Sequence, residues 1–104
     1  MAVKLRQNIT GTATQALITA GSNINNIGEI LLTNVHATDA ATVDLYVGDS
    51  ANSFYIIKNT EVPFGTSLLL NSKSLKFINT TGAFGLFIKL GAGSVDVHIK
   101  RESW

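Results

Sequence analysis

Cysteine is absent from the 104-residue chain, proline occurs once, and charged residues make up only 14% of the sequence. Without cysteine the chain can form no disulfide framework, no thiolate zinc site and no cysteine nucleophile. The charged fraction is well below the roughly 25% of an average soluble domain. Thr, Ser, Asn and Gly take the place of charged residues, as in residues 8–12 and 23–26. Such surfaces form hydrogen bonds at little desolvation cost, which suits permanent contacts in an assembly.

Long apolar runs are missing as well. No run approaches the roughly 20 residues needed to span a bilayer, so we expect no membrane partner. Polar residues, and not an apolar segment, follow residues 1–6. We therefore expect cytoplasmic synthesis without a signal peptide. The basic residues are scattered singly, whereas nucleic-acid binding needs a concentrated basic patch with stacking aromatics, so nucleic acid is not an expected partner.

Alternation of apolar and polar residues is abundant. Residues 42–47 and 95–100 place an apolar side chain at every second position, which predicts strands with one face in a core. Residues 29–35 and 53–58 are apolar on both faces, which predicts central strands or strands whose outer face meets a partner. Further strands are expected at residues 15–19, 67–71, 75–78 and 85–90, and an edge strand or extended arm at residues 2–9.

Turn residues separate these segments. Residues 91–93 (Gly-Ala-Gly) predict a tight hairpin, because glycine accepts the positive φ that short hairpins require. No stretch keeps a 3.6-residue period, and residues 37–41 are the only short helix that we expect. We therefore predict one all-β domain over residues 1–104, with an N-terminal arm and first strand in residues 1–27. The expected architecture is an antiparallel β-sandwich, jelly-roll-like or Ig-like, of about seven to nine short strands.

Residues that could carry catalysis do not form a recognisable site. His36 and His98 are the only histidines, and no nucleophile in a Gly-x-Ser-x-Gly setting accompanies them. Asp96 and His98 share one strand face, which allows joint metal ligation, but no third ligand is indicated. The acidic residues that follow in the first half lack the spacing of a calcium loop: Asp39, Asp44 and Asp49. We expect no enzyme, no metal site and no cofactor.

Aromatic residues are the candidates for a contact surface. Those of the second half are Phe54, Tyr55, Phe64, Phe77, Phe84 and Phe87. They form either the core of the domain or an apolar interface, where aromatics contribute most of the binding energy. The only tryptophan, Trp104, is either held against the domain or offered to a neighbour. The predicted interface residues are Val3, Leu5, Ile9, Tyr46, Phe64 and Trp104.

Several segments carry motifs that can be compared with a known family. They are residues 29–35 (EILLTNV), 43–47 (VDLYV), 55–58 (YIIK), 62–68 (VPFGTSL) and a closing strand at 95–100. Over residues 28–100 the chain resembles small virion structural proteins of tailed bacteriophages. In that family a Leu-Leu-x-Asn strand and a Tyr-x-Ile strand precede a Val-Pro-x-Gly-x-Ser-Leu connection.

The resemblance implies a β-sandwich that sits on the virion as a capsid cement or decoration protein. Its partner would be the major capsid protein or another virion protein, and it would form a homo-oligomer, a dimer or trimer. A tail, baseplate or fibre-attachment component is the alternative within the virion. A carbohydrate-binding module is a further alternative, which needs an exposed aromatic platform, with Tyr46 as its candidate. We expect the N-terminal arm and Trp104 to make the first contacts, and deleting either to leave the sandwich folded.

Overall fold

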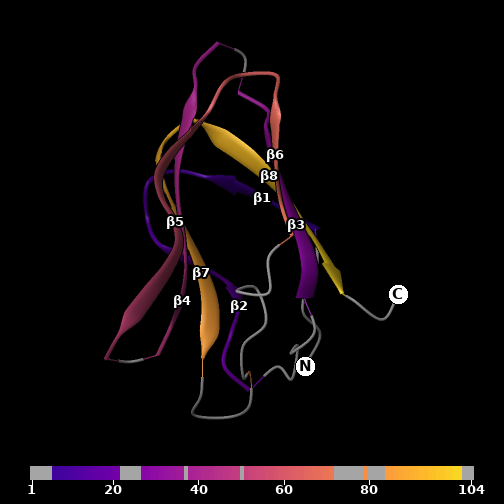
Figure 1. Cartoon of the computed structure of the whole chain (residues 1–104). Coiled ribbons are helices and arrows are strands. Elements are labelled where there is room, and N and C mark those ends of the chain that lie inside the picture. The colour runs from indigo at the N-terminus through magenta and orange to yellow at the C-terminus, as the bar shows by residue number, and fades with distance from the viewer. Residues whose placement is uncertain are drawn as a thin grey trace.

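The structure is a computed structural model of the chain, and it describes residues 6–21, 27–36, 38–49, 51–71, 79 and 84–101. These residues contain eight β-strands and no helix (Figure 1). The strands are β1 (Arg6–Thr10), β2 (Gln15–Ile18), β3 (Ile27–Asn34), β4 (Ala41–Gly48), β5 (Ser53–Val62), β6 (Ser67–Leu70), β7 (Gly85–Ala92) and β8 (Ser94–Arg101). Within the described ranges there is accordingly no helix that is long and apolar enough to cross a membrane.

Two four-stranded sheets form the sandwich, ordered β1-β8-β3-β6 and β2-β7-β4-β5, and all neighbouring strands are antiparallel. Four of the pairs are nested along the chain: β4 with β5, β3 with β6, β2 with β7, and β1 with β8. This nesting arises when one long antiparallel hairpin wraps round so that successive strand pairs fall in opposite sheets. It is the topology of a jelly roll, whereas an Ig constant-type domain has seven strands in a four-and-three arrangement. Of the two predicted sandwich types, the jelly roll is therefore the one present.

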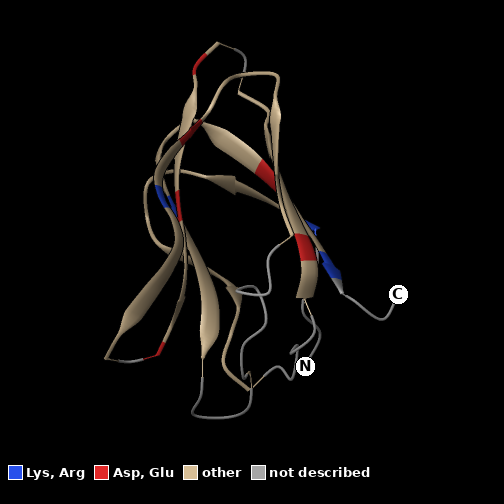
Figure 2. Cartoon of the chain, in the orientation of Figure 1, with Lys and Arg blue, Asp and Glu red and all other residues tan. Residues whose placement is uncertain are grey.

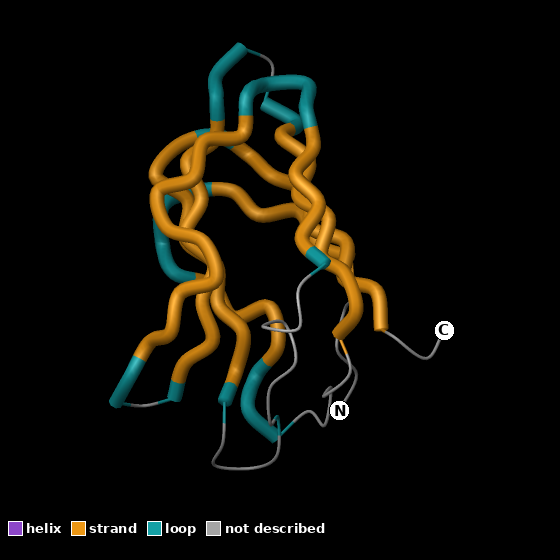
Figure 3. The backbone as a smooth tube through the Cα atoms, in the orientation of Figure 1, coloured by secondary structure: helices purple, strands orange, loops and turns teal. Residues whose placement is uncertain are grey.

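Connections in this topology carry the chain from one sheet to the other. The links β1–β2, β3–β4 and β5–β6 all change sheet, as the tube in Figure 3 shows. The hairpin predicted at residues 91–93 is wrong: a tight turn joins β7 to β8 there, with Gly93 at a φ of 88°, but the two strands lie in opposite sheets and do not pair with each other. The helix expected at residues 37–41 is wrong for the described part of that range, because residues 38–40 are irregular and Ala41 opens β4. The strand expected at residues 75–78 lies outside the described residues.

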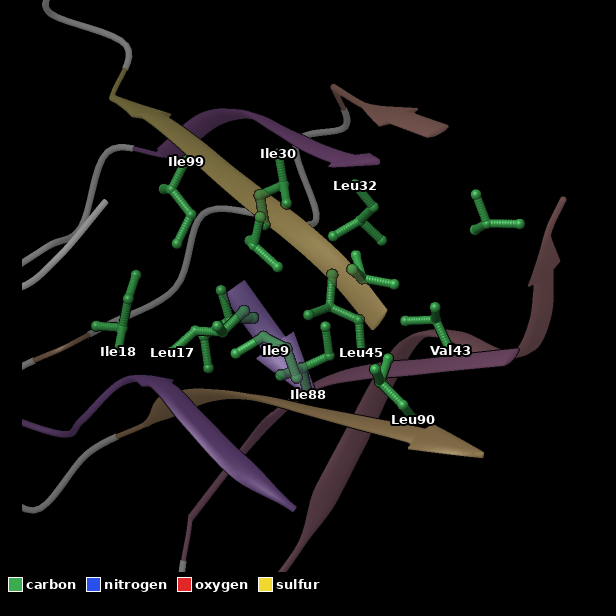
Figure 4. Packing of buried hydrophobic residues seen from close by; sticks show 14 of the residues in the cluster. Ile9, Leu17, Ile18, Ile30, Leu32, Val43, Leu45, Ile88, Leu90 and Ile99 are labelled. Carbon is green, nitrogen blue, oxygen red and sulfur yellow. The ribbon is translucent and has the colours of Figure 1, made fainter. Parts of the chain in front are cut away.

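The core between the sheets is aliphatic. Its buried side chains are Ile9, Leu17, Ile18, Ile27, Ile30, Leu32, Ala41, Val43, Leu45, Val47, Val62, Leu86, Ile88, Leu90, Val95, Val97 and Ile99. The labelled ones point toward one another in Figure 4. The two-residue period predicted for residues 42–47 and 95–100 is confirmed, because their apolar positions supply this core and their alternate positions do not.

The N-terminal segment takes part in this core. Residues 6–10 form the edge strand β1, which pairs with β8 from Arg6↔His98 to Thr10↔Ser94. Ile9 is only 1% exposed. Its place among the predicted interface residues is therefore corrected: because its side chain is enclosed between the sheets, Ile9 is a core residue.

Asn34, the last residue of β3, is buried and holds one end of the sandwich together. Its Nδ2 donates to the carbonyl oxygens of Asp39 (2.9 Å) and Val62 (2.8 Å). Its Oδ1 accepts from the backbone N–H of His36 at 2.9 Å. One amide thus satisfies backbone groups at the ends of β3 and β5 and in the β3–β4 connection.

The β5–β6 turn closes on the same residue. The Pro63 carbonyl accepts from the N–H of Thr66 (3.2 Å) and from its hydroxyl (2.6 Å), and Gly65 has a φ of 71°. The Asn34 N–H donates to the Thr66 carbonyl (3.0 Å), and the Gly65 N–H donates to the Asn34 carbonyl (3.3 Å). The Leu-Leu-x-Asn and Val-Pro-x-Gly motifs are thus two halves of one structural unit.

Candidate functional site

His36 has a structural part in the β3–β4 connection. Its Nδ1 accepts hydrogen bonds from the backbone N–H groups of Thr38 (3.2 Å) and Asp39 (3.1 Å). Asp39 Oδ2 also lies 3.9 Å from this nitrogen. The two backbone hydrogen bonds to Nδ1 give His36 its place in the connection.

Asp96 and His98 lie on the outer face of β8, as the period predicted. Asn8 Nδ2 donates to Asp96 Oδ1 at 2.8 Å, and His98 is exposed opposite Arg6. They line an open, shallow depression together with Arg6, Gln7, Asn8 and Val97. Among the described residues, no group of three or more His, Cys, Asp or Glu side chains could hold a metal ion.

Asp49, just beyond the end of β4, and Asp44, opposite a bulge of β5, both accept hydrogen bonds from backbone N–H groups. Asp49 Oδ1 accepts from the N–H groups of Ala51 and Asn52, both at 2.8 Å, and these bonds hold the pKa of the Asp49 carboxyl below its usual value. Asp44 Oδ1 accepts from the N–H of Asn59 at 2.6 Å, where Asn59 has a φ of 50° in a bulge of β5. Figure 2 shows the charged residues as isolated bands along the described ribbon.

All described aromatic residues lie outside the buried core. Phe54 (56%), Tyr55 (47%) and Phe64 (58%) are exposed, and Tyr46, Phe84 and Phe87 are half-buried. The alternative in which the aromatics of the second half form the core is therefore wrong for Phe54, Tyr55, Phe64 and Phe87. Phe84 packs against the core without being buried in it. Phe77 and Trp104 lie outside the described residues.

Three of the aromatics form a row across the outer face of the β2-β7-β4-β5 sheet. The strand register places Phe87 opposite Tyr46 and Tyr46 opposite Tyr55, and we call these three residues the aromatic row. The Phe87 and Tyr46 ring centroids are 5.3 Å apart at an interplanar angle of 21°, and those of Tyr46 and Tyr55 are 5.1 Å apart at 46°. Lys58 Nζ lies 4.2 Å from the Tyr55 centroid, within the range of a cation–π contact.

A pair of glycines makes room for two of these rings. Gly48 on β4 and Gly85 on β7 lie opposite each other. Along each strand they are two residues from the ring of the aromatic row, on the same face of the sheet. A Cβ on Gly48 would lie 3.3 Å from the Tyr46 ring, and one on Gly85 would lie 3.2 Å from the Phe87 ring. The two rings therefore lean over the glycine backbones, an arrangement that any side chain at these positions would disturb.

Charged residues lie on the other side of the aromatic row. Lys89 on β7 lies opposite Asp44 on β4, and Lys58 lies on β5 next to Asn59, whose N–H binds Asp44. We call Lys89, Asp44 and Lys58 the charged row. The outer face of this sheet thus carries aromatic rings beside a cation, a carboxylate and a second cation.

Other exposed apolar side chains are distributed over the molecule. Val35, which is 46% exposed, and Phe64 lie at the end of the sandwich that Asn34 closes. Val35 follows Asn34 in the chain, and Phe64 precedes Gly65, whose N–H donates to the Asn34 carbonyl. Phe54 packs edge-on against Phe84 at 6.0 Å, near the opposite end of β5. Leu69 (51%) lies on the edge strand β6 of the other sheet.

The predicted interface residues therefore do not form one patch. Tyr46 lies in the aromatic row, Phe64 lies at one end of the sandwich, and Ile9 is in the core, while Val3, Leu5 and Trp104 lie outside the described residues. Sequence reasoning missed Phe87 and Tyr55 as neighbours of Tyr46. The sequence could have placed Phe87 on the outer face of β7, because it lies between two apolar residues that point into the core.

The arrangement offers stacking surfaces and hydrogen-bonding groups on one sheet face, and apolar contacts elsewhere. Comparison with protein-family models, with curated protein sequences and with solved structures finds no match for this chain.

Proposed function

We propose that the chain is a non-enzymatic virion structural protein that binds the assembled capsid as a cement or decoration protein. The observation that carries this proposal is the placement of exposed apolar side chains at several separate places outside the aliphatic core of the described residues. The sequence resemblance to small phage virion proteins points the same way.

The spacing of the apolar contacts suits a protein with more than one neighbour. Phe54 lies near the start of β5 and Phe64 just beyond its end, so they are roughly 30 Å apart at ~3.3 Å per strand residue. The longest extent of the molecule is 39 Å. A small ligand needs one apolar site, whereas a subunit seated between shell proteins makes contacts at several sides.

The low charge and the fold agree with this role. Jelly rolls are common in viral capsid proteins, although fold alone does not assign a function. A ligand that binds only the assembled shell stabilises it by RT ln(1 + L/Kd), where L is the free ligand concentration, so the term grows with that concentration and no catalytic group is required. The proposed partner is the major capsid protein, and the proposed state on the shell is a dimer or trimer.

Copy number in purified virions tests the proposal. We expect quantitative mass spectrometry to give a ratio to the major capsid protein of one, or a simple fraction set by shell symmetry. If each particle instead contained only a few copies of the protein, the capsid assignment would be replaced by a tail, baseplate or fibre-attachment role. Absence from the particle would overturn a virion role altogether.

A surface variant tests which residues make the contact. Phe64→Ser should weaken binding to capsids that lack the protein, while its thermal unfolding midpoint stays close to that of the wild type, because Phe64 is 58% exposed. Thr12→Ser, in the exposed β1–β2 connection, is the control. Equal capsid binding by wild type and Phe64→Ser would remove this residue from the interface.

A further inference from the structure

The two open sides of the sandwich differ in how well they enclose the core. On one side lie the edge strands β1 and β2, whose core side chains are at most 3% exposed: Ile9, Leu17 and Ile18. On the other side lie the edge strands β5 and β6, joined by the turn at residues 63–66. The apolar side chains that pack against the core there are only half-buried: Ile56, Ile57, Leu68 and Leu70. The aliphatic core therefore reaches the surface on the β5–β6 side.

The edge of β6 is open to a further strand. Edge strands are commonly protected by a charged side chain, a proline or a bulge. β6 is short, but its four residues include no charge and no proline, and they pair with β3 residue for residue. Leu69, on the outer face, is 51% exposed. Among the described strands β6 is the last of its sheet, so its free edge can form a ladder with another extended strand.

β5 carries charges of both signs on the outer face of its sheet. Glu61 lies opposite Thr42, and Lys58 reaches over the Tyr55 ring on the same face. When β5 meets a copy of itself in antiparallel orientation, centred between residues 59 and 60, Lys58 of each copy faces Glu61 of the other. The strand is thus complementary in charge to its own copy. Because Asn59 lies in a bulge, we assign the hydrogen-bonded ladder to β6 and the charge contact to β5.

A single two-fold axis can serve both strands. The turn between β5 and β6 is centred at residues 64–65, and residues 59–60 and residue 69 are nearly equally far from it along the chain. They therefore lie across from each other in the two sheets. A strip as long as the ten residues of β5, ~33 Å, and ~20 Å wide has an area on the order of 700 Å², close to the roughly 800 Å² per partner of a standard interface.

From these observations we propose that the β5–β6 side is the interface of a two-fold symmetric dimer of this chain. Leu69 meets Leu69 of the second copy, Lys58 meets Glu61, and the half-buried side chains of both copies complete one shared core. The proposal deepens the homo-oligomeric part of the proposed function and rests on that part alone, because it is tested in solution without capsids.

Sedimentation velocity of the full chain, up to several hundred micromolar, tests the interface. We expect a concentration-dependent species of twice the 11.1 kDa mass of the chain. Leu69→Lys places like charges opposite each other at the axis and should weaken dimerisation by about tenfold or more. Ala16→Lys is the matched control, because it adds the same charge at an exposed position of β2, the edge strand on the opposite side. It should dimerise as the wild type does, and thermal unfolding should show that both variants are folded.

Two charge-reversal variants separate a contact between copies from one within a copy. Lys58→Glu and Glu61→Lys each place like charges across the axis, so each alone should dimerise more weakly than the wild type. An equimolar mixture of the two brings opposite charges together again at both contacts. We expect the mixture to form a heterodimer that is tighter than either homodimer.

Three results would overturn the proposal: a wild type that stays monomeric over this range, a Leu69→Lys variant that dimerises like the wild type, or a mixture that associates no more tightly than the single variants. A monomer found in virions at a capsid ratio would overturn the dimer and leave the capsid role intact. A dimer that the variants disrupt as expected, from a protein absent from virions, would support the interface and overturn only the capsid role.

Discussion

Asn34 shows how a single side chain can close a jelly roll. Three separate stretches of backbone end near it, and their polar groups would lack partners because the loops there do not continue a ladder. An amide is suited to this place, since it offers two donors and an acceptor on one rigid group. The asparagine in the Leu-Leu-x-Asn motif is thereby explained by folding, and no ligand is needed to account for it.

Replacement of this residue should be costly. Asn34→Ala leaves the Val62 and Asp39 carbonyls and the His36 N–H without their partner in a buried setting. We expect a loss of roughly 1–3 kcal/mol in the free energy of unfolding, measured by urea denaturation. Asn8→Ala, which removes one exposed hydrogen bond to Asp96, should cost less. Equal losses in the two variants would contradict the role given to Asn34.

The lowered pKa of Asp49 makes the stability of the fold depend on pH. Its pKa is lowered in the folded chain by hydrogen bonds from the Ala51 and Asn52 N–H groups. A lowered folded pKa means that the stabilisation is fully present above the unfolded value, about 4, and disappears as the pH falls through the folded pKa. Asp49→Asn should therefore lower the thermal midpoint at pH 7, and the difference from wild type should shrink as the pH falls below about 4.

A control for net charge accompanies this measurement. Asp39→Asn makes the same change in formal charge at a side chain that is 71% exposed. The thermal midpoints of Asp49→Asn and wild type could instead differ by the same amount at acidic pH as at pH 7. That result would show that the carboxylate charge does not stabilise the β4–β5 turn.

At the scale of elements, the strands differ in what their outer faces carry. On β4 and β7 the inner positions hold aliphatic side chains, and the outer positions hold a glycine, an aromatic ring and a charged residue, in opposite order along the two strands. Because these two antiparallel strands are in register, like residues meet: Gly48 with Gly85 and Tyr46 with Phe87. The aromatic row is therefore a product of strand pairing, and neither strand contains it alone.

The turn between β7 and β8 gives a test of backbone conformation. Gly93 has a φ of 88°, and an added Cβ would lie 3.1 Å from the Ala41 Cβ. Gly93→Ala should lower the free energy of unfolding by about 1–2 kcal/mol through the left-handed conformation, plus a steric cost. Gly11→Ala has a similar φ of 81° but meets nothing within 4 Å, so it isolates the conformational part. A smaller loss in Gly93→Ala than in Gly11→Ala, measured by urea denaturation, would contradict the close packing against Ala41.

At the scale of the whole molecule, the first and last described strands close the fold. Asn8 and Asp96 are 88 residues apart in sequence and are hydrogen-bonded across β1 and β8. Ile9 enters the core from the same strand. The N-terminal segment is thus part of the sandwich from Arg6 onward, and the idea that it is a dispensable arm does not hold for that part.

Removal of the segment should unfold the chain. A variant without residues 2–9 loses the β1–β8 ladder and the buried Ile9 side chain, so we expect no cooperative thermal transition by circular dichroism. The milder Ile9→Ala should keep a transition, with a loss of about 2–5 kcal/mol in the free energy of unfolding. A deletion variant that melts as the wild type does would show that β1 is not needed for folding.

Strand periodicity, turn residues and the fold class could be read from the sequence, because they depend on near neighbours in the chain. The alternation in residues 42–47 and 95–100 correctly named the core positions of β4 and β8. The glycines at 91–93 marked a tight turn, but not that this turn crosses from one sheet to the other, so the expected hairpin was wrong. The choice between jelly roll and Ig-like sandwich could not be read, because it depends on which distant strands pair.

The sequence by itself determined that this chain is an all-β sandwich, since a two-residue period and β-branched residues act locally. That its core is aliphatic was decided by the tertiary structure, because the sequence left open whether the aromatics are buried. Only the tertiary structure decided that Ile9 is buried, that Asn34 meets the Pro63 turn, and that Phe87, Tyr46 and Tyr55 share one face. Each of these facts depends on the register between strands far apart in the chain. Register is fixed by packing of the whole core, and no short segment encodes it.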